Sequence, residues 1–496
     1  MNLAGIVDGH PDDAIALVNR GRPQSYGEVR EGIDRLRSGL AGLGLEPGDR
    51  VGIACANSPW FATAYLAALG RGCVAVPLNP TSPAAELTRQ LATVGVKALV
   101  VGPQAVAAVR QLDRSALPDL VCLLATPGAD LDDATPLDQL DGHDPVPVVD
   151  RAPDDLAALI FTAGTAGSPK AAMLTHGSLS ANIAQVQALP ERCLRAEDVL
   201  LGVLPLFHIF GLNVVLGVGL AAGASIVLVE RFDPASALDT IRNHGITVVA
   251  GAPPMWTAWA SMPGVAPDAF ASVRMATSGA SKLPEETALA VRERFGLVVS
   301  EGYGLTEASP VVTSSVGDGA RTGSIGRPLP GVEVRVVDDG EDAFLGDAGE
   351  IWVRGPNVFA GYWQDEQATA DALTPDGWLR TGDVAVADDG GNLWIVDRSK
   401  DLIIVSGFNV YPAEVEEALL EHPGIAEVAV VGVASPYSGE AVKAFVVAEE
   451  GKHLEEDEVI DFCATQLARY KCPTKVMFVP ELPQGLGGKV LRRQLR

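Results

Sequence analysis

The chain has 496 residues, more than one hydrophobic core usually fills, so at least two domains are expected. Its 37 Lys and Arg and 63 Asp and Glu give a formal charge of −26, which excludes the basic footprint that nucleic acids require. An anionic substrate must therefore be held by a few well-placed cations and not by the overall charge.

The cysteines and the apolar runs indicate in which cellular compartment the protein is found. The six cysteines form no Cys-x-x-Cys pair and lie mostly in apolar runs, as buried thiols in a reducing compartment do. The first residues include neither a basic region nor an apolar stretch of secretory length. The apolar run Leu212–Val229 is interrupted by glycines, which predicts a buried helix followed by the strand Ala224–Val229. We expect a cytoplasmic protein without an integral membrane segment.

Short β-rich runs alternate with helical patterns over most of the chain. This alternation predicts the α/β class, with layers built on largely parallel sheets. One helical pattern covers Ala85–Val94. The expected strands are Val51–Ala54, Val74–Pro77, Ala98–Val101, Leu120–Leu124, Leu156–Thr162, Ser225–Val229, Val248–Gly251 and Val273–Thr277.

After Asp383 the pattern changes to a small α+β module of about a hundred residues. A helix is expected to begin at Pro412 and to end before His422-Pro-Gly424. A second helix would present Val459, Cys463, Leu467 and Tyr470 on one face. The expected strands are Asn392–Val396, Leu402–Val405, Val428–Val433 and Val442–Ala448.

The charged segment Arg398–Asp401 lies between apolar strands and can serve as a hinge. The sequence therefore predicts an N-terminal domain over residues 1–397, a hinge over 398–401 and a C-terminal domain over 402–496.

A phosphate-binding segment is expected at Phe161–Lys170, Phe-Thr-Ala-Gly-Thr-Ala-Gly-Ser-Pro-Lys, which follows a strand. Backbone N–H groups, hydroxyls and the lysine can surround phosphate oxygens. A Walker loop is excluded, because Pro169 stands where that loop has glycine. The alternative is a flexible surface turn without a ligand. The candidate residues are Thr162, Ala163, Gly164, Thr165, Ala166, Gly167, Ser168 and Lys170.

A second motif, Gly302-Tyr-Gly-Leu-Thr-Glu307, places an aromatic ring between two glycines and then a hydroxyl and a carboxylate. Tyr303 can stack on a purine, and Glu307 can bind a hard cation such as magnesium through oxygen. A dinucleotide fingerprint is excluded, because Glu307 stands where a third glycine would be needed.

Two shorter segments can complete a nucleotide site. Gly279, Ala280 and Ser281 follow an expected strand and can present their backbone to the same purine. Thr381-Gly-Asp383 places a carboxylate at a tight turn, where it can bind ribose hydroxyls. An Asx turn without a ligand explains that segment equally well.

These motifs occur in one order over essentially the whole chain, which therefore resembles the adenylate-forming superfamily of acyl-CoA synthetases, non-ribosomal adenylation domains and firefly luciferase. The resemblance implies a large N-terminal domain, a small mobile C-terminal domain and ATP chemistry in the cleft between them. The matching segments are Phe161–Lys170, Pro205-Leu-Phe-His208, Gly302–Glu307, Thr381-Gly-Asp383, Asp397–Gly407 with Asn409, and Gly488-Lys489.

The resemblance also implies how ATP is held. Residues Thr162–Lys170 would bind the β- and γ-phosphates, Tyr303 would stack on adenine, and Asp383 and Arg398 would bind the ribose. The remaining residues expected at ATP or AMP are Gly279, Ala280, Ser281, Gly302, Gly304, Thr306 and Lys489.

For the adenylation step, the resemblance implies that Thr306 contacts the α-phosphate, that Glu307 holds Mg²⁺, and that Lys489 bridges the substrate carboxylate and the α-phosphate. The chemistry agrees with these roles, because a carboxylate that attacks a phosphate brings two anions together. Cations placed on both groups and on the leaving pyrophosphate stabilise that transition state.

In the second step a thiol displaces AMP, and a lysine on the reacting carbonyl is no longer needed. By resemblance, Lys400 occupies the hinge, and a turn of the small domain would present Ser406 and Gly407 to the pantetheine arm of CoA. Gly407 would let that arm pass close to the backbone.

The chain departs from the family pattern at several positions. Ala163 and Ala166 stand where the phosphate loop usually has Ser and Thr, and Gly487 and Gln484 replace a usual Thr and Lys. Backbone amides can still bind phosphate, so we expect weaker or slower ATP handling and not loss of activity. A degenerate, non-catalytic homologue is the alternative.

The acyl pocket is expected around His208, Ile209, Asn213 and Gly302. His208 can equally be a satisfied core residue. No carboxylate in this segment could pair with an amino acid's ammonium group, and Gly302 replaces the Arg of malonate-type relatives. An apolar acid is therefore expected, either a fatty acid of medium to long chain or an aryl acid.

Two tryptophans, Trp256 and Trp259, lie three residues apart in an expected helix. They would shorten the pocket if they face it, whereas core packing is the commoner role of such a pair.

The acceptor is expected to be CoA, because Ser406-Gly-Phe-Asn409 and Gly439-Glu-Ala-Val-Lys443 resemble the CoA-using branch. An acyl-AMP ligase that loads an acyl carrier protein is the alternative, although such enzymes usually carry an insertion for which this chain has no room. The expected small molecules are the carboxylic acid, ATP with Mg²⁺, and CoA. The sequence leaves the oligomeric state open, a homodimer included.

Overall fold

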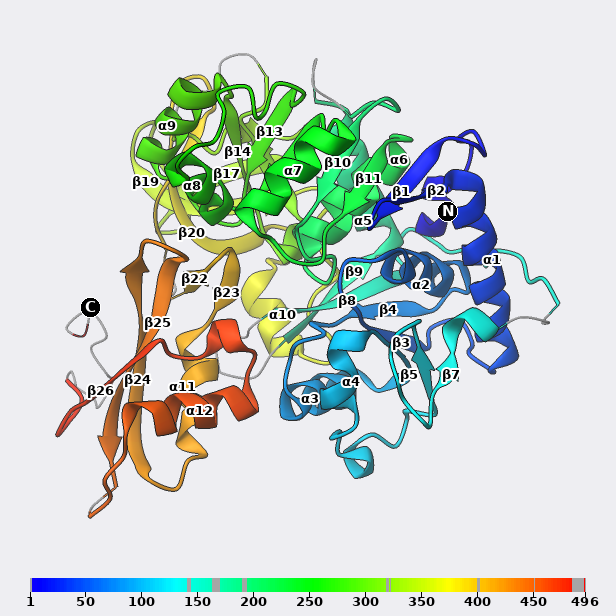
Figure 1. Cartoon of the computed structure of the whole chain (residues 1–496). Helices are drawn as coiled ribbons and strands as arrows, with labels where there is room; N and C mark the ends of the chain where they lie inside the picture. The colour runs from blue at the N-terminus through cyan, green and yellow to red at the C-terminus, as the bar shows by residue number, and fades with distance from the viewer. Residues whose placement is uncertain are drawn as a thin grey trace.

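The computed structural model describes residues 2–140, 144–162, 170–189, 194–317, 321, 323–398, 402–449, 451–483 and 495. In Figure 1 two large sheets and their helices form most of the molecule, and a separate α+β module, orange to red, contains the C-terminal part of the chain from β22 onward. This arrangement confirms the expected α/β class with a large N-terminal and a smaller C-terminal domain. The boundary at 398–401 stays a prediction, because residues 399–401 lie outside the described ranges.

The first sheet has seven strands in the order β7-β6-β5-β3-β4-β8-β9, parallel except for the last pair. Its strands are β3 (Arg50–Ala54), β4 (Val74–Pro77), β5 (Val96–Val101), β6 (Cys122–Ala125), β7 (Thr135–Pro136), β8 (Leu156–Thr162) and β9 (Lys170–Thr175). Its helices are α1 (Tyr26–Gly42), α2 (Pro59–Gly70), α3 (Ala84–Val94) and α4 (Val106–Val109).

The second sheet has nine strands in the order β16-β15-β14-β13-β12-β10-β11-β1-β2. Its strands are β1 (Ile15–Asn19), β2 (Arg22–Ser25), β10 (Val199–Gly202), β11 (Ser225–Leu228), β12 (Val248–Gly251), β13 (Met275–Ser278), β14 (Val299–Gly304), β15 (Val311–Ser314) and β16 (Arg327–Pro328). The accompanying helices are α5 (His176–Gln187), the π-helix η5 (Phe210–Val218), α6 (Gly219–Ala221), α7 (Pro234–His244), α8 (Pro253–Ser261) and α9 (Glu285–Phe295).

The third sheet is antiparallel and links the large domain to the small one. It has the order β18-β17-β19-β20-β21. Its strands are β17 (Glu333–Asp338), β18 (Glu341–Asp342), β19 (Ala348–Arg354), β20 (Leu379–Ala387) and β21 (Leu393–Arg398), with α10 (Glu366–Ala372) between β19 and β20.

The small domain is built on a sheet of five strands. Four have the order β23-β22-β25-β24, and β26 also pairs with β25, parallel to it. Its elements are β22 (Ile403–Val405), β23 (Phe408–Val410), α11 (Pro412–Leu420), β24 (Ile425–Ser435), β25 (Gly439–Ala448), α12 (Glu456–Gln466), the 3-10 turn η7 (Arg469–Lys471) and β26 (Lys475–Phe478). The expected second helix ends at Gln466, so Tyr470 lies on η7 and not on that helix.

The sequence explains why the main elements form where they do. Helix α2 is apolar on every side and almost wholly buried, so it packs between layers and does not cover a surface. Ser25 and Thr175 accept hydrogen bonds from the first turns of α1 and α5, which fixes where these helices begin. Within the described residues, no helix is both long and apolar enough to cross a membrane.

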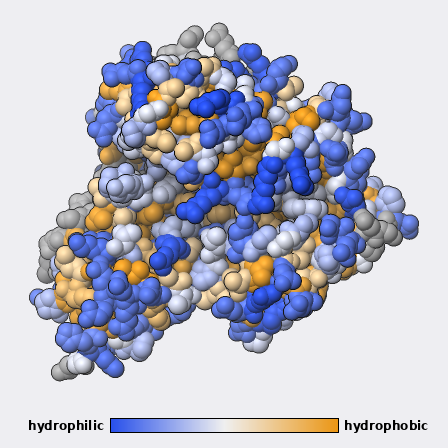
Figure 2. Space-filling model, in the orientation of Figure 1, coloured by the Kyte–Doolittle hydropathy of each residue, from blue (hydrophilic) through white to orange (hydrophobic). Residues whose placement is uncertain are grey.

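Most charged residues lie at the surface, whereas a few, among them Glu86, Glu414 and Lys471, are buried. Figure 2 shows a mostly hydrophilic face with scattered hydrophobic residues, hollowed where the upper lobe meets the two lower lobes. One buried cluster joins the two large sheets, whereas residues Ile403 to Val476 form a core of their own.

Candidate active site

A large cavity of about 610 Å³ lies where the second sheet, the third sheet and the small domain meet. Strands β12, β13 and β14 run parallel to one another and end at it. Ligands of open α/β sheets bind beyond the carboxyl ends of such strands. Of the residues described, the cavity therefore brings together elements from all four sheets at the position where this fold binds ligands.

Tyr303 and Asp383 meet on one side of the cavity. The Tyr303 hydroxyl donates a hydrogen bond of 2.8 Å to Asp383 Oδ2, and the ring is only 9% exposed. Tyr303 lies in β14, and Thr381-Gly-Asp383 lies in β20. The prediction of a tight turn at Thr381-Gly-Asp383 is therefore wrong. A Cβ at Gly304 would lie 2.2 Å from the carbonyl oxygen of Pro310, so only glycine fits there.

Glu307 lies on the 3-10 turn η6 (Thr306–Ala308) and lines the same cavity as Thr306. Its Oε1 accepts a hydrogen bond of 2.7 Å from the Tyr362 hydroxyl. Burial, and then the Glu307 charge, raise the pKa of Tyr362, so the phenol keeps its proton and remains a donor. Tyr362 was not predicted from the sequence, where its only local signal is the glycine directly before it.

Thr162 and Lys170 are brought together by the antiparallel pairing of β8 and β9, in which they lie opposite each other. Both line the cavity, and the Lys170 ammonium lies 5.3 Å from the centre of the Tyr362 ring and 3.9 Å from Asp365 Oδ2. The cation is thus held near the Glu307–Tyr362 pair. The candidate residues between them, Ala163, Gly164, Thr165, Ala166, Gly167 and Ser168, lie outside the described residues.

Arg398 pairs with Asp383 across β20 and β21, which places the two expected ribose-binding residues side by side in the backbone. Lys400, which is expected at the hinge, and Lys489 lie outside the described ranges.

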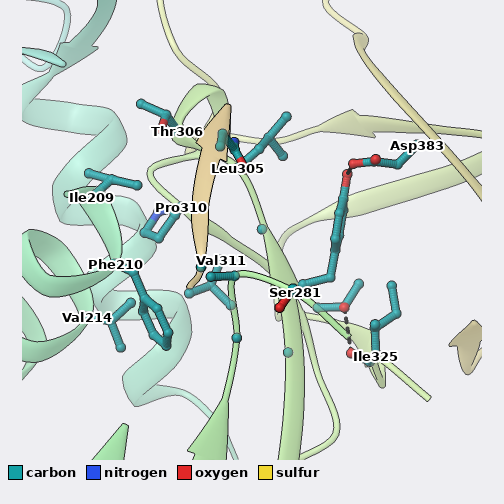
Figure 3. Close-up of a pocket in the computed structure, with 18 of the residues that line it drawn as sticks. Ile209, Phe210, Val214, Ser281, Leu305, Thr306, Pro310, Val311, Ile325 and Asp383 are labelled. Carbon is teal, nitrogen blue, oxygen red and sulfur yellow. Dashed lines mark hydrogen bonds between the residues drawn. The ribbon is translucent and has the colours of Figure 1, made fainter. Parts of the chain in front are cut away.

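The opposite side of the cavity is apolar. Figure 3 shows Ile209, Phe210 and Val214, all from η5 or the residue before it, on the side away from Asp383. A Cβ at Gly279 would lie 2.9 Å from the Phe210 ring, so glycine lets that ring pack against the β13–α9 loop. Further apolar lining residues are Val186, Leu189, Leu194, Leu200, Val215, Val218, Val248, Ala250, Met275, Val311, Val316 and Ile325.

His208 lines both this cavity and a smaller one next to the small domain. Burial lowers the pKa of His208 to about 4, so the imidazole is neutral near pH 7. Its Nδ1 accepts a hydrogen bond of 3.3 Å from the Phe210 N–H, and its ring lies edge-on to Phe408 at 6.1 Å. The structure therefore places His208 at the pocket and not in a closed core.

The remaining pocket candidates differ in position. Gly302 and Ile209 line the cavity, and a Cβ at Gly302 would lie 3.1 Å from the carbonyl oxygen of Thr313. Asn213 does not line it, because its amide donates to the carbonyl oxygens of Leu179 and Ser309 on the other face of η5. Asn213 is therefore a buried structural residue, contrary to the expectation from sequence.

Gly279, Ala280 and Ser281 line the cavity, and their contact with a nucleotide stays a prediction. Gly407 of the small domain also reaches it, with φ +89° and a Cβ position 3.3 Å from both Ala252 and Ala280. Ser406 is exposed and does not line it.

Trp256 and Trp259 are fully buried and pack against each other at 5.2 Å between ring centres. Phe270 contacts both, and neither tryptophan lines the cavity. They are core residues and do not set the length of the pocket.

A magnesium ion could be held here by one protein carboxylate. Glu307 offers the oxygen ligand, and magnesium bound to a nucleotide usually takes one or two carboxylates together with phosphate oxygens and water. The described residues contain no cluster of three or more His, Cys, Asp or Glu that would hold a metal by itself. The donor set thus fits an ion that arrives with a phosphate ligand.

Comparisons with known proteins agree with this geometry. The family model "AMP-binding enzyme" matches residues 4–363, and "AMP-binding enzyme C-terminal domain" matches residues 414–489. The chain is 36% identical to 4-coumarate–CoA ligase 2 of Nicotiana tabacum, over 97% of this chain and 90% of that protein. It is 37% identical to feruloyl-CoA synthase of Amycolatopsis sp, over 97% and 95%. The amide bond synthetase McbA of Marinactinospora thermotolerans superposes with a TM-score of 0.87 at 31% identity, over 100% and 99%.

Proposed function

The chain belongs to the AMP-binding enzyme family, and from that premise we propose that it is an ATP-dependent acid–CoA ligase. It joins an apolar carboxylic acid to AMP with release of pyrophosphate, and then transfers the acyl group to CoA. The coumarate and ferulate ligases among its relatives support the reaction class.

One observation carries this proposal. A single cavity joins a polar side, with Tyr303, Asp383, Thr306 and Glu307, to an apolar side formed by η5 and the strands β12 and β13. A nucleotide and the acyl tail of an acid can therefore lie in one space, with their reactive groups meeting between the two sides.

In the first step the acid's carboxylate oxygen attacks the α-phosphorus, and the bond to the β-phosphate breaks to release pyrophosphate. Lys489 would neutralise the reacting oxygens, and Thr306 would donate to the α-phosphate. Lys170 and the segment before it would hold the leaving phosphates. A magnesium ion on Glu307, when bound, supplies positive charge to the phosphate oxygens.

In the second step the thiol of CoA loses its proton and attacks the acyl carbonyl, and AMP leaves. Gly407 already lines the cavity, where its backbone packs closely against Ala252 and Ala280, and the pantetheine arm would pass beside this glycine. A hinge at Lys400 would alternate this face of the small domain with the one that carries Lys489.

The acid is proposed to be an aryl acid or a fatty acid of medium to long chain. The η5 side of the cavity presents Phe210, Val214, Val215 and Val218, which offer the tail no charged partner. Each methylene buried there contributes roughly 0.8 kcal/mol. An acid with a second carboxylate would meet no side chain at Gly302 to pair with it.

The test is a pyrophosphate-release screen over cinnamic-type acids and straight-chain acids of graded length, each with and without CoA. The proposal predicts release that depends on the acid, together with an acyl-CoA product. Product only with a holo carrier protein would instead indicate a carrier-loading ligase, and an amide formed from an added amine would indicate an amide synthetase. No release with any acid would indicate a non-catalytic homologue.

A further inference from the structure

A buried charge cluster joins the small domain to helix α3, away from the residues of the proposed chemistry. Both carboxylate oxygens of Glu86 on α3 bind the small domain. Its Oε2 accepts a hydrogen bond of 2.8 Å from the Ala468 N–H, and its Oε1 accepts one of 2.6 Å from Lys471 Nζ. The side chains of Glu86 and Lys471 are only 2% and 6% exposed. This contact therefore spans 385 residues of sequence in a water-poor environment.

Lys471 is shared between the two domains. Its ammonium also lies 2.6 Å from Glu414 Oε1, which belongs to α11 of the small domain. Glu414 Oε2 is buried without a hydrogen-bond partner, and burial raises the pKa of this carboxyl group. The Lys471–Glu414 pair is internal to the small domain, whereas Glu86 is the component that crosses to the large domain.

The cluster is connected to the cavity through aromatic contacts. Tyr470, the neighbour of Lys471, stacks on Phe408 with 4.5 Å between ring centres. Phe408 in turn contacts Phe207 at 6.3 Å and His208 at 6.1 Å. Since Gly407 precedes Phe408, these ring contacts connect η7 with the glycine that lines the cavity.

Glu86 depends on the small domain for its strong partners. Within the large domain its side chain has one described hydrogen bond, a long one of 3.5 Å from Gln90 Nε2. A desolvated carboxylate without strong partners is costly, so Glu86 would have to be hydrated if the small domain turned away. Such a contact favours one domain arrangement and can be released when another forms. It does not serve to hold α3 itself together.

We propose that Glu86 is a positioning residue for the thioester step, because its bonds to Lys471 and Ala468 hold the small domain where Gly407 lines the cavity. This inference rests on the proposed function. In adenylation, where Lys489 must reach the same cavity, the contact would be absent.

The test compares Glu86→Ala with the wild type in two separate half-reactions. Pyrophosphate release without CoA should change by less than about twofold. Acyl-CoA formation from synthetic acyl-AMP and CoA should fall by about 10- to 100-fold, as expected for loss of charge-assisted hydrogen bonds. Glu86→Gln keeps an acceptor for the Ala468 N–H and should be intermediate. Glu285→Ala, at an exposed position on α9, is the matched control and should leave both rates unchanged.

A readout without catalysis separates this inference from the proposed function. The Ala468 amide is buried and bonded to Glu86, so its hydrogen exchange should be faster in Glu86→Ala while amides of β12 and β13 stay protected. A wild type inactive in both half-reactions would overturn the proposed function. An equal loss in both steps, or unchanged exchange at Ala468, would overturn the role of Glu86. If Glu86→Ala does not fold, Glu86→Gln and Arg89→Ala decide the same comparison. Arg89→Ala removes another contact between α3 and the small domain, the hydrogen bond of 3.0 Å that Arg89 donates to the Gln466 carbonyl oxygen.

Discussion

The hydroxyl of Tyr362 donates a hydrogen bond of 2.7 Å to Oε1 of Glu307, although the two residues are 55 positions apart. The bond engages one carboxylate oxygen of a side chain that lines the cavity. Residues that orient a metal-binding carboxylate in this way usually raise metal affinity.

Tyr362→Phe should therefore lower the affinity for magnesium in the adenylation step without abolishing activity. Loss of one hydrogen bond to a charged group costs about 1.5 kcal/mol or more, so the magnesium concentration for half-maximal rate should rise about tenfold. Tyr437→Phe, at a position 89% exposed, is the control. An unchanged magnesium titration would show that Tyr362 does not orient Glu307 for a metal.

Lys489→Ala should abolish acyl-AMP formation from ATP and leave the fold intact. The lysine stands in the Gly-rich segment Gly485–Lys489, which is poor material for a core. Because the thioester step needs no cation on the carbonyl, synthetic acyl-AMP should still yield acyl-CoA at an appreciable rate. Acyl-AMP formation at the parent rate would contradict the assignment.

Val214→Trp should shift the preference toward short acids. Val214 lies on the apolar side of the cavity, so an indole there would occupy the space of the tail (Figure 3). Each methylene denied its contact should cost on the order of 0.8 kcal/mol. A series of kcat/KM values over chain length decides the point, with Val298→Trp at an exposed position as control. A uniform drop for all acids would mean that Val214 does not contact the tail.

His176 should make the protein less stable in mild acid. It is 1% exposed in the first turn of α5, where its Nδ1 accepts a hydrogen bond of 3.1 Å from the Leu3 N–H. Burial, and then the charge of Arg151, lower its pKa from 6.5 to about 4. The unfolded chain therefore binds the proton first, and the stabilisation is complete above pH 6.5 and is lost as the pH falls toward 4.

Between pH 7 and pH 5 this histidine should reduce the free energy of unfolding by about 2 kcal/mol. Denaturant titrations of the wild type and His176→Gln at both pH values measure the difference. The variant should show the shallower pH dependence, and equal slopes would exclude the assignment.

The strands were predictable because apolar runs that are buried on both faces stand out in the sequence. The bounds expected for β4, β8 and β12 match the structure to the residue. Of the antiparallel sheet β17–β21 only β21 was expected, as the strand Asn392–Val396 of the small module. The other strands were not foreseen, since their half-exposed residues mix polar and apolar side chains.

The motifs also indicated much of the cavity lining, from Thr162 to Gly407. Asn213 was misplaced, because a side chain in an apolar run can face either side of a helix. The contacts Tyr362–Glu307 and Glu86–Lys471 could not be foreseen. They join distant segments, and their residues form no local pattern.

Acid and ATP are proposed to react directly in one cavity before any thiol is involved. The exchange of labelled pyrophosphate into ATP tests this reaction, measured without CoA, with and without an apolar acid such as cinnamate or decanoate. We predict exchange that depends on both magnesium and the acid, and that Lys489→Ala abolishes. Exchange that is absent with every acid in the series, or that occurs equally without acid, would contradict it.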